Sequence, residues 1–120
     1  SDIKDFITKA EIIQSAKDLN HNICLAYTRT EASNINIVIA QAADELLNVK
    51  EVEASFVLGK KDDRVFISAR SLGNINVHVL MEKLGGGGHR DMAGAQLNTS
   101  LEEAYEMVKA TIETYIKEEE

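Results

Sequence analysis

Apolar side chains recur every three or four residues in two long segments near the start of the chain. In residues 3–16 they are Ile3, Phe6, Ile7, Ala10, Ile13 and Ala16. In residues 31–48 they are Ile35, Val38, Ile39, Ala42, Leu46 and Leu47. Side chains at this spacing lie along one face of a helix. The pattern therefore predicts two amphipathic helices, separated by a break at Asn20-His21-Asn22.

Strand-like patterns follow each of these helices. Residues 22–28 indicate a short buried strand between them. Residues 52–59 and 64–69 are rich in residues that favour strands, and Lys60-Lys61-Asp62-Asp63 separates them, which predicts a hairpin with a charged turn. Residues 92–97 indicate a further strand of small residues, which allow another backbone to approach closely.

Two helices complete the pattern in the last third of the chain. A short one is indicated by apolar residues ahead of a glycine run, namely Val77, Leu80, Met81 and Leu84. The last helix begins with Ser100 and Glu103, a pair at capping-box spacing. The order αβαββαβα predicts an α/β fold, a mixed sheet flanked by helices. At 120 residues, positions 1–120 form a single domain large enough for a core.

Charge limits the partners that this chain can take. The net charge is −7, which counts against a free-standing binder of long nucleic acids. Residues 59–98 nevertheless carry a net +2, so a small phosphate ligand is compatible with this third of the chain. The sequence has no apolar run long enough to predict a membrane span or a signal peptide. Cys24 is the single cysteine and lies in an apolar run, which favours a buried thiol and a cytosolic protein.

The segment GGGGHRDMAGAQL, residues 85–97, is the strongest candidate for a binding site. Four consecutive glycines cost conformational entropy, which a sharp turn or a close approach to a ligand explains. Backbone N–H groups beside His89 and Arg90 suit a phosphate or nucleotide. We expect Gly87→Val to damage ligand recognition, because a β-branched side chain blocks both a close approach and any positive φ. The alternative is a flexible connection with a solvated histidine and arginine.

Arg70 and Ser71 end the second hairpin strand, a place where ligands commonly bind in α/β sheets. Arg70 could clamp a phosphate with two hydrogen bonds, and Ser71 could add a hydroxyl; a surface ion pair and a turn residue are the alternatives. His21 and His78 share no metal-like spacing with each other or with His89. We identify no catalytic group and no metal ligand in this chain.

Three stretches together resemble the DHH-associated (subfamily 1) substrate-binding domain of the Asp-His-His phosphoesterase superfamily. They are ISARS (residues 67–71), NINVHVLMEKLGGGGH (residues 74–89) and the small strand that follows. ADELL (residues 43–47) and the helix–strand–helix start fit as well, so the resemblance covers nearly the whole chain. The variant is most similar to membrane-anchored cyclic di-AMP phosphodiesterases that also carry a degenerate GGDEF domain.

The resemblance implies a division of labour between two domains. A separate Asp-His-His catalytic domain, which this sequence lacks, would hold manganese and hydrolyse the phosphodiester. This chain would need no cofactor, would be inactive alone, and would hold cyclic di-AMP against the catalytic domain of the same parent chain. The parent would be anchored to the membrane, with this part on its cytoplasmic side. The substrate-binding residues carried over are Arg70, Ser71, Gly86, Gly87, Gly88 and His89.

A second function from another class stays open. The same resemblance extends to exonuclease-type proteins, in which the domain would bind single-stranded nucleic acid or oligoribonucleotides, and to a related domain of alanyl-tRNA synthetase. The charge of −7 favours a small dinucleotide over a longer strand. A homodimer also stays open.

Overall fold

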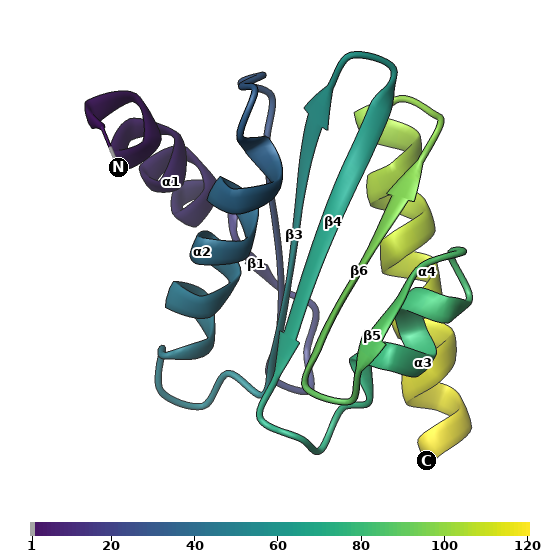
Figure 1. Ribbon diagram of the computed structural model, residues 1–120. Coiled ribbons are helices and arrows are strands. Elements are labelled where there is room, and N and C mark those ends of the chain that lie inside the picture. The colour runs from purple at the N-terminus through teal and green to yellow at the C-terminus, as the bar shows by residue number, and fades with distance from the viewer. Residues whose placement is uncertain (1) are drawn as a thin grey trace.

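A six-stranded sheet runs through the molecule, with helices on both faces (Figure 1). The computed structural model describes residues 2–120. The helices are α1 (Ile3–Ser15), α2 (Ile35–Leu47), α3 (Val77–Glu82) and α4 (Leu101–Glu119). The strands are β1 (Lys17–Asp18), β2 (Ile23–Thr28), β3 (Ala54–Lys61), β4 (Arg64–Ser71), β5 (Gly87–His89) and β6 (Met92–Leu97).

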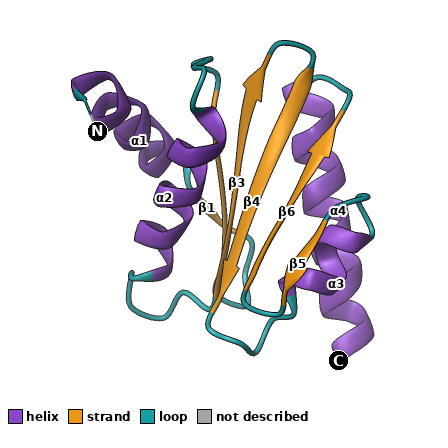
Figure 2. Cartoon of the chain, viewed as in Figure 1, coloured by secondary structure: helices purple, strands orange, loops and turns teal. Residues whose placement is uncertain are grey.

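The strands lie in the order β1-β2-β3-β4-β6-β5 (Figure 2). β2 and β3 pair in parallel and all other neighbours pair antiparallel, so the sheet is mixed, and the predicted α/β fold is confirmed. The two very short edge strands, β1 and β5, are additions to the predicted order. The hairpin is also longer than expected, because Lys60 and Lys61 still pair with β4 and leave Asp62 and Asp63 for the turn.

The two faces of the sheet bury different sets of side chains, because successive residues of a strand point to opposite faces. On one face, Phe56, Leu58 and Ile67 pack in a core that α3 and α4 complete. On the other face, Ala26 and Val57 pack against residues of α1 and α2. α2 contacts β3 and β4. Figure 1 shows no helix over β6 and β5 on this side among the described residues.

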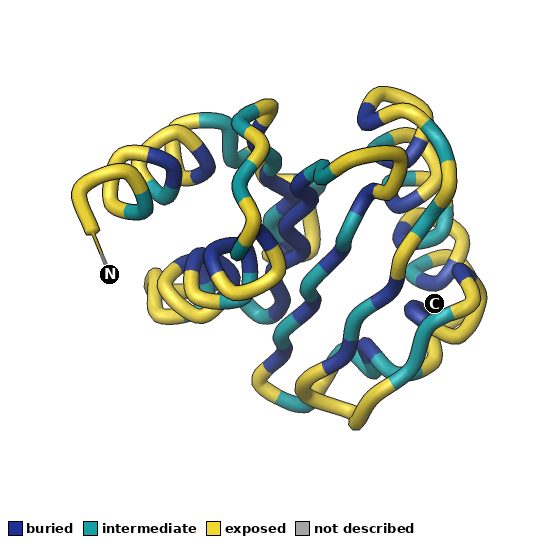
Figure 3. The backbone as a smooth tube through the Cα atoms, turned by 45° about the horizontal axis from the view of Figure 1, so that its top comes forward, coloured by how far each residue is buried: buried dark blue, intermediate teal, exposed yellow. Residues whose placement is uncertain are grey.

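Helix α1 forms where the spacing predicts it, but it does not bury the apolar residues that define the spacing. Thr8 and Ile12 are its buried residues. Ile3 is 73% exposed and Phe6 is 70% exposed, so much of the tube of α1 is coloured as exposed (Figure 3). The reason is that α1 packs on β2 and α2 along a different stripe, and the stripe of Ile3, Phe6, Ile7 and Ala10 faces solvent.

Helix α4 is the longest, and its start agrees with the predicted cap. The Ser100 hydroxyl accepts a hydrogen bond from the Glu103 N–H at 3.1 Å. Near its other end, the Tyr115 hydroxyl accepts from the Asn76 N–H at 3.0 Å, which ties α4 to the segment before α3. None of the helices in residues 2–120 combines the length and the apolar character needed to cross a membrane.

Candidate functional site

On the side of the sheet that carries α2, no helix of the described residues covers β6 and β5. These two strands and the adjoining residues of β4, at the edge of α2, form a shallow surface, which we call the open face. Strand pairing aligns its side chains in rows across the three strands, and paired residues point to the same side. One row joins Arg70, Met92 and His89. The next row joins Ser68, Gly94 and Gly87. The structure therefore brings Arg70, His89 and the glycine segment together, although they are up to 19 positions apart in the sequence.

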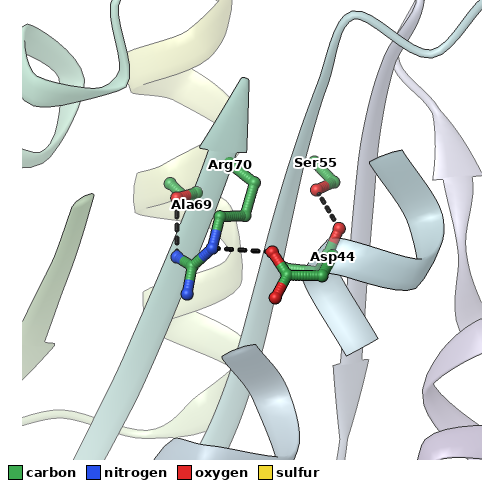
Figure 4. A network of polar contacts seen from close by, with 5 residues as sticks. Asp44, Ser55, Ala69 and Arg70 are labelled. Carbon is green, nitrogen blue, oxygen red and sulfur yellow. Dashed lines mark hydrogen bonds and ion pairs between the residues drawn. The ribbon is translucent and has the colours of Figure 1, made fainter. Parts of the chain in front are cut away.

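Arg70 is held in place at the edge of α2 (Figure 4). Its Nε donates to Asp44 Oδ1 at 2.9 Å and its Nη1 donates to the Ala69 carbonyl at 3.0 Å. The Ser55 hydroxyl, buried beside this pair, donates to the Ala43 carbonyl at 2.7 Å and fixes this turn of α2 on the sheet. The Arg70 side chain is 12% exposed, whereas Asp44 is 59% exposed. The remaining guanidinium donors can serve a ligand on the open face.

Ser71 lies on the opposite side of β4 from Arg70, as the alternation along a strand requires. Its hydroxyl donates to the Ile75 carbonyl at 2.6 Å and accepts from the Gly73 N–H at 2.8 Å. The residue is 5% exposed. These contacts give Ser71 a place in the turn after β4, away from the row of Arg70 and His89. Its role toward a ligand stays a prediction that the contacts do not support.

The first two glycines of the run end helix α3 and bring the chain against β6. The Gly85 N–H donates to the Glu82 carbonyl at 3.0 Å and the Gly86 N–H donates to the Met81 carbonyl at 2.8 Å, the bond pattern of a Schellman motif. Gly85 has φ +84°, which a side chain would strain. A Cβ on Gly86 would lie 2.0 Å from the Gly94 carbonyl oxygen. Both positions therefore need glycine for the fold itself.

Gly87 differs from its neighbours, and the expectation that it needs a positive φ is wrong. The close approach of a ligand to Gly87 stays a prediction. A Cβ placed on Gly87 would meet no atom within 4 Å, and its φ is not positive. Gly88 has φ +146°, and its Cβ would overlap Ala93 Cα at 2.5 Å. The protein itself therefore has room for a side chain at Gly87, on the open face. A ligand lying there would use that space.

His89 and Arg90 end β5 and begin the turn to β6. His89 is exposed, and its pairing with Met92 places it in the same row as Arg70. The Arg90 Nε donates to the Gly73 carbonyl at 2.7 Å, which joins this turn to the turn after β4. Within the described residues, the side chains of His89 and Asp91 in this turn make no hydrogen bond, whereas Arg90 is a structural link.

Sequence reasoning missed a hollow that continues the open face toward the start of α2. Its volume is about 530 Å³, and its lining includes Asn36, Phe66, Ser68, Gly86 and Gln96. The alternation of β4 could have pointed to it, since Phe66, Ser68 and Arg70 are two residues apart and share one face. Asp44 was noticed as part of ADELL, but its pairing with Arg70 depends on how α2 packs.

A second hollow, of about 270 Å³, lies at the far edge of the sheet between β2 and α4. Tyr27 and Tyr105 meet there edge to face with ring centroids 5.6 Å apart, and the Arg29 guanidinium lies 5.6 Å from the centre of the Tyr27 ring. Arg29 also pairs with Glu102, and this hydrogen bond lowers the pKa of Glu102. Burial raises the pKa of Tyr105. The carboxylates of Glu102 and Glu106 line this hollow beside Lys17 and Arg29, so a phosphate there would meet two negative groups.

Metal-binding and thiol chemistry have little basis in residues 2–120. In this part of the chain no three His, Cys, Asp or Glu side chains are placed to hold a metal ion. Instead, His78 lies 3.5 Å from Glu82 on its own helix, and His21 lies 3.7 Å from Glu120. Burial, together with the charge of Asp18, raises the pKa of the Cys24 thiol, which disfavours the reactive thiolate.

Known proteins match this chain in sequence and in fold. The family model described as DHHA1 domain matches residues 20–118. The chain is 41% identical over 119 residues to the cyclic-di-AMP phosphodiesterase GdpP of Bacillus subtilis (strain 168), an alignment that covers 96% of this chain and 18% of that protein. It is 38% identical over 120 residues to the cyclic-di-AMP phosphodiesterase PdeA of Listeria monocytogenes serotype 1/2a (strain 10403S), an alignment that covers 98% of this chain and 18% of that protein. The chain thus spans under a fifth of these relatives.

Among solved structures, an exopolyphosphatase-related protein from Bacteroides fragilis superposes with a TM-score of 0.80. The match covers 96% of this chain and 36% of that one, at 20% sequence identity. At this low sequence identity, the superposition shows that the two chains share a fold.

Proposed function

Because the chain belongs to the DHHA1 domain family, we propose that it is the substrate-binding domain of a phosphodiesterase that opens cyclic di-AMP to linear pApA. The names of the relatives support this substrate, since both are cyclic-di-AMP phosphodiesterases. In this proposal the open face holds the dinucleotide, and Arg70 together with His89 and the bare backbone at Gly87 contacts a phosphate.

The main support for the proposal is the row of Arg70, Met92 and His89, which lies beside the row that contains Gly94 and Gly87. A guanidinium that is already fixed contributes more to the affinity for a phosphate than a mobile one, because less side-chain freedom is lost on binding. Asp44 and the Ala69 carbonyl already fix that of Arg70. The neighbouring row lacks side chains at Gly94 and Gly87, so a ligand can approach the backbone. β5 is an edge strand, and every second N–H of an edge strand points away from the sheet.

Hydrolysis is assigned to other residues of the parent protein. Metal-assisted cleavage of a phosphodiester needs a cluster of ligands, and manganese does not fit the donors found in residues 2–120. We therefore propose that a catalytic Asp-His-His domain in the same polypeptide supplies the manganese and the nucleophile. The residues of this chain bind and orient the dinucleotide.

Substitution of Arg70 by alanine tests the proposal in the natural protein that contains this chain. A hydrogen bond to a charged group contributes about 1.5–3 kcal/mol. We therefore expect R70A to weaken the apparent affinity for cyclic di-AMP by about 10- to 150-fold, with manganese content unchanged. Steady-state kinetics and metal analysis measure the two quantities.

Arg29→Ala is the matched control. Arg29 also forms an ion pair with a carboxylate, but it lies at the other edge of the sheet. We expect R29A to leave the affinity within about twofold of the wild type, the usual range for a surface substitution. Equal effects of R70A and R29A, or no effect of R70A, would remove Arg70 from the site.

A further inference from the structure

The Arg70 guanidinium has only part of its hydrogen-bonding capacity left for a ligand. Its Nε donates to Asp44 Oδ1 at 2.9 Å, and its Nη1 donates to the Ala69 carbonyl at 3.0 Å (Figure 4). A guanidinium has five N–H groups, so within the described residues one N–H of Nη1 and both of Nη2 stay without a partner. N–H groups on neighbouring nitrogens match two oxygens of a phosphate. A phosphate bound at this edge of Arg70 therefore shares the guanidinium with the Asp44 carboxylate.

The packing of α2 holds Asp44 beside Arg70. Ser55 is the β3 partner of Arg70, so both side chains point to the face of the sheet that carries α2. Ser55 is fully buried, and its hydroxyl donates to the carbonyl of Ala43 in α2 at 2.7 Å. This bond fixes the helix one residue before Asp44. The carboxylate is thus held in place by the fold as well as by its attraction to Arg70.

The Asp44 carboxylate opposes negative charge on whatever Arg70 binds. A phosphodiester carries one negative charge, whereas a phosphomonoester carries about 1.5 to 2 near neutral pH. An oxygen bonded to the free edge of Arg70 lies about 6 Å from the carboxylate, two hydrogen-bond lengths. One additional negative charge at that distance weakens binding by about 3-fold in water, and by more where solvent is excluded. Because the Asp44 side chain is 59% exposed, the lower part of this range applies.

We propose that Asp44 is a specificity-determining residue that shifts the preference of Arg70 from phosphomonoesters toward phosphodiesters. The inference rests on the proposed function, because it places a phosphate of the dinucleotide at Arg70. Cyclic di-AMP contains only phosphodiesters, whereas linear pApA ends in a phosphomonoester. The carboxylate therefore weakens the binding of the product more than the binding of the substrate, which favours product release.

Inhibition of cyclic di-AMP hydrolysis in the natural protein by pApA and by ApA tests the inference. These linear dinucleotides differ only in the terminal phosphate, so the ratio of their inhibition constants reports its contribution. Asp44→Asn keeps an oxygen that can accept from Arg70 Nε but removes the charge. We expect D44N to strengthen inhibition by pApA, relative to ApA, by about 3- to 10-fold at about pH 8, where the monoester is a dianion.

Glu102→Gln is the matched control. Glu102 is the carboxylate partner of Arg29 at the other edge of the sheet, and we expect E102Q to leave the ratio of inhibition constants unchanged. An equal change of the ratio in E102Q and D44N would reduce the effect to overall charge and overturn the role of Asp44.

The R70A variant distinguishes failure of this inference from failure of the proposed function. If R70A raises the KM for cyclic di-AMP but D44N leaves the ratio of inhibition constants unchanged, the specificity role of Asp44 is wrong and the phosphate site stands. If R70A is silent, the proposed function fails and the role of Asp44 fails with it.

Discussion

Gly86 and Gly87 are adjacent in the sequence, but the structure surrounds them differently. Gly86 is confined by the protein, since its Cβ would overlap the Gly94 carbonyl. Gly87 borders open space on the face where we place the ligand. Substitutions at the two positions can therefore distinguish an effect on folding stability from an effect on ligand binding.

We expect Gly86→Ala to lower the free energy of unfolding by more than about 2 kcal/mol, because strand β6 would have to move. Gly87→Ala should leave it unchanged or raise it by up to about 1 kcal/mol, since alanine has less freedom to lose on folding. Cyclic di-AMP binding should nevertheless weaken in G87A. Urea unfolding and calorimetric titration measure the two effects. Unchanged binding by a folded G87A would show that no ligand lies against this strand.

Single residues also show how far the sequence predicts the site. Arg70, His89 and the glycine run could be identified from their types and from the family resemblance. Their alignment in rows could not, because it depends on the pairing of β4, β6 and β5. For the same reason the sequence could not separate Arg70 from Ser71. Once the strand is known to include both, alternation places their side chains on opposite faces.

Among the elements, the long helices and the four main strands could be predicted, because spacing and turn residues mark them locally. β1 and β5 could not, since each has two or three residues and exists only through its pairing with a neighbour. The buried stripe of α1 was not predictable either. The apolar residues of α1 outnumber the positions that β2 and α2 can cover, and the contact selects Thr8 and Ile12.

Two substitutions in α1 test this orientation. Ile12 is fully buried, so I12A should lower the free energy of unfolding by about 2–5 kcal/mol. Phe6 is 70% exposed, so F6A should change it by no more than about 0.5 kcal/mol. Urea unfolding of both variants measures the difference. A larger loss in F6A than in I12A would mean that α1 packs through the stripe that the sequence pattern identifies.

At the scale of the whole molecule, charge determines which phosphate ligand is favoured. The net charge of −7 repels a long polyanion, while the open face holds Arg70 and is bordered by Arg64. A dinucleotide can meet these two arginines, of which Arg70 is paired with Asp44, without extending over the acidic remainder. A longer strand would have to extend beyond these arginines.

A salt titration therefore distinguishes the two classes of ligand. We expect the protein to bind cyclic di-AMP more tightly than a single-stranded 10-mer of deoxyadenylate at physiological salt. The affinity for cyclic di-AMP should fall only gently as salt rises, because few phosphates are contacted. Tighter binding of the 10-mer with a steep dependence on salt would favour the oligonucleotide-binding alternative.

The location of bound cyclic di-AMP is the most direct test of the account. In a titration of the ¹⁵N-labelled chain followed by NMR, we expect the largest amide shifts in the glycine segment and its row partners, at Gly86, Gly87, His89, Gly94 and Arg70. The amides around Tyr27, Arg29 and Tyr105 at the other edge of the sheet should stay unchanged. Shifts concentrated at that second hollow, or none at saturating cyclic di-AMP, would contradict the placement of the dinucleotide on the open face.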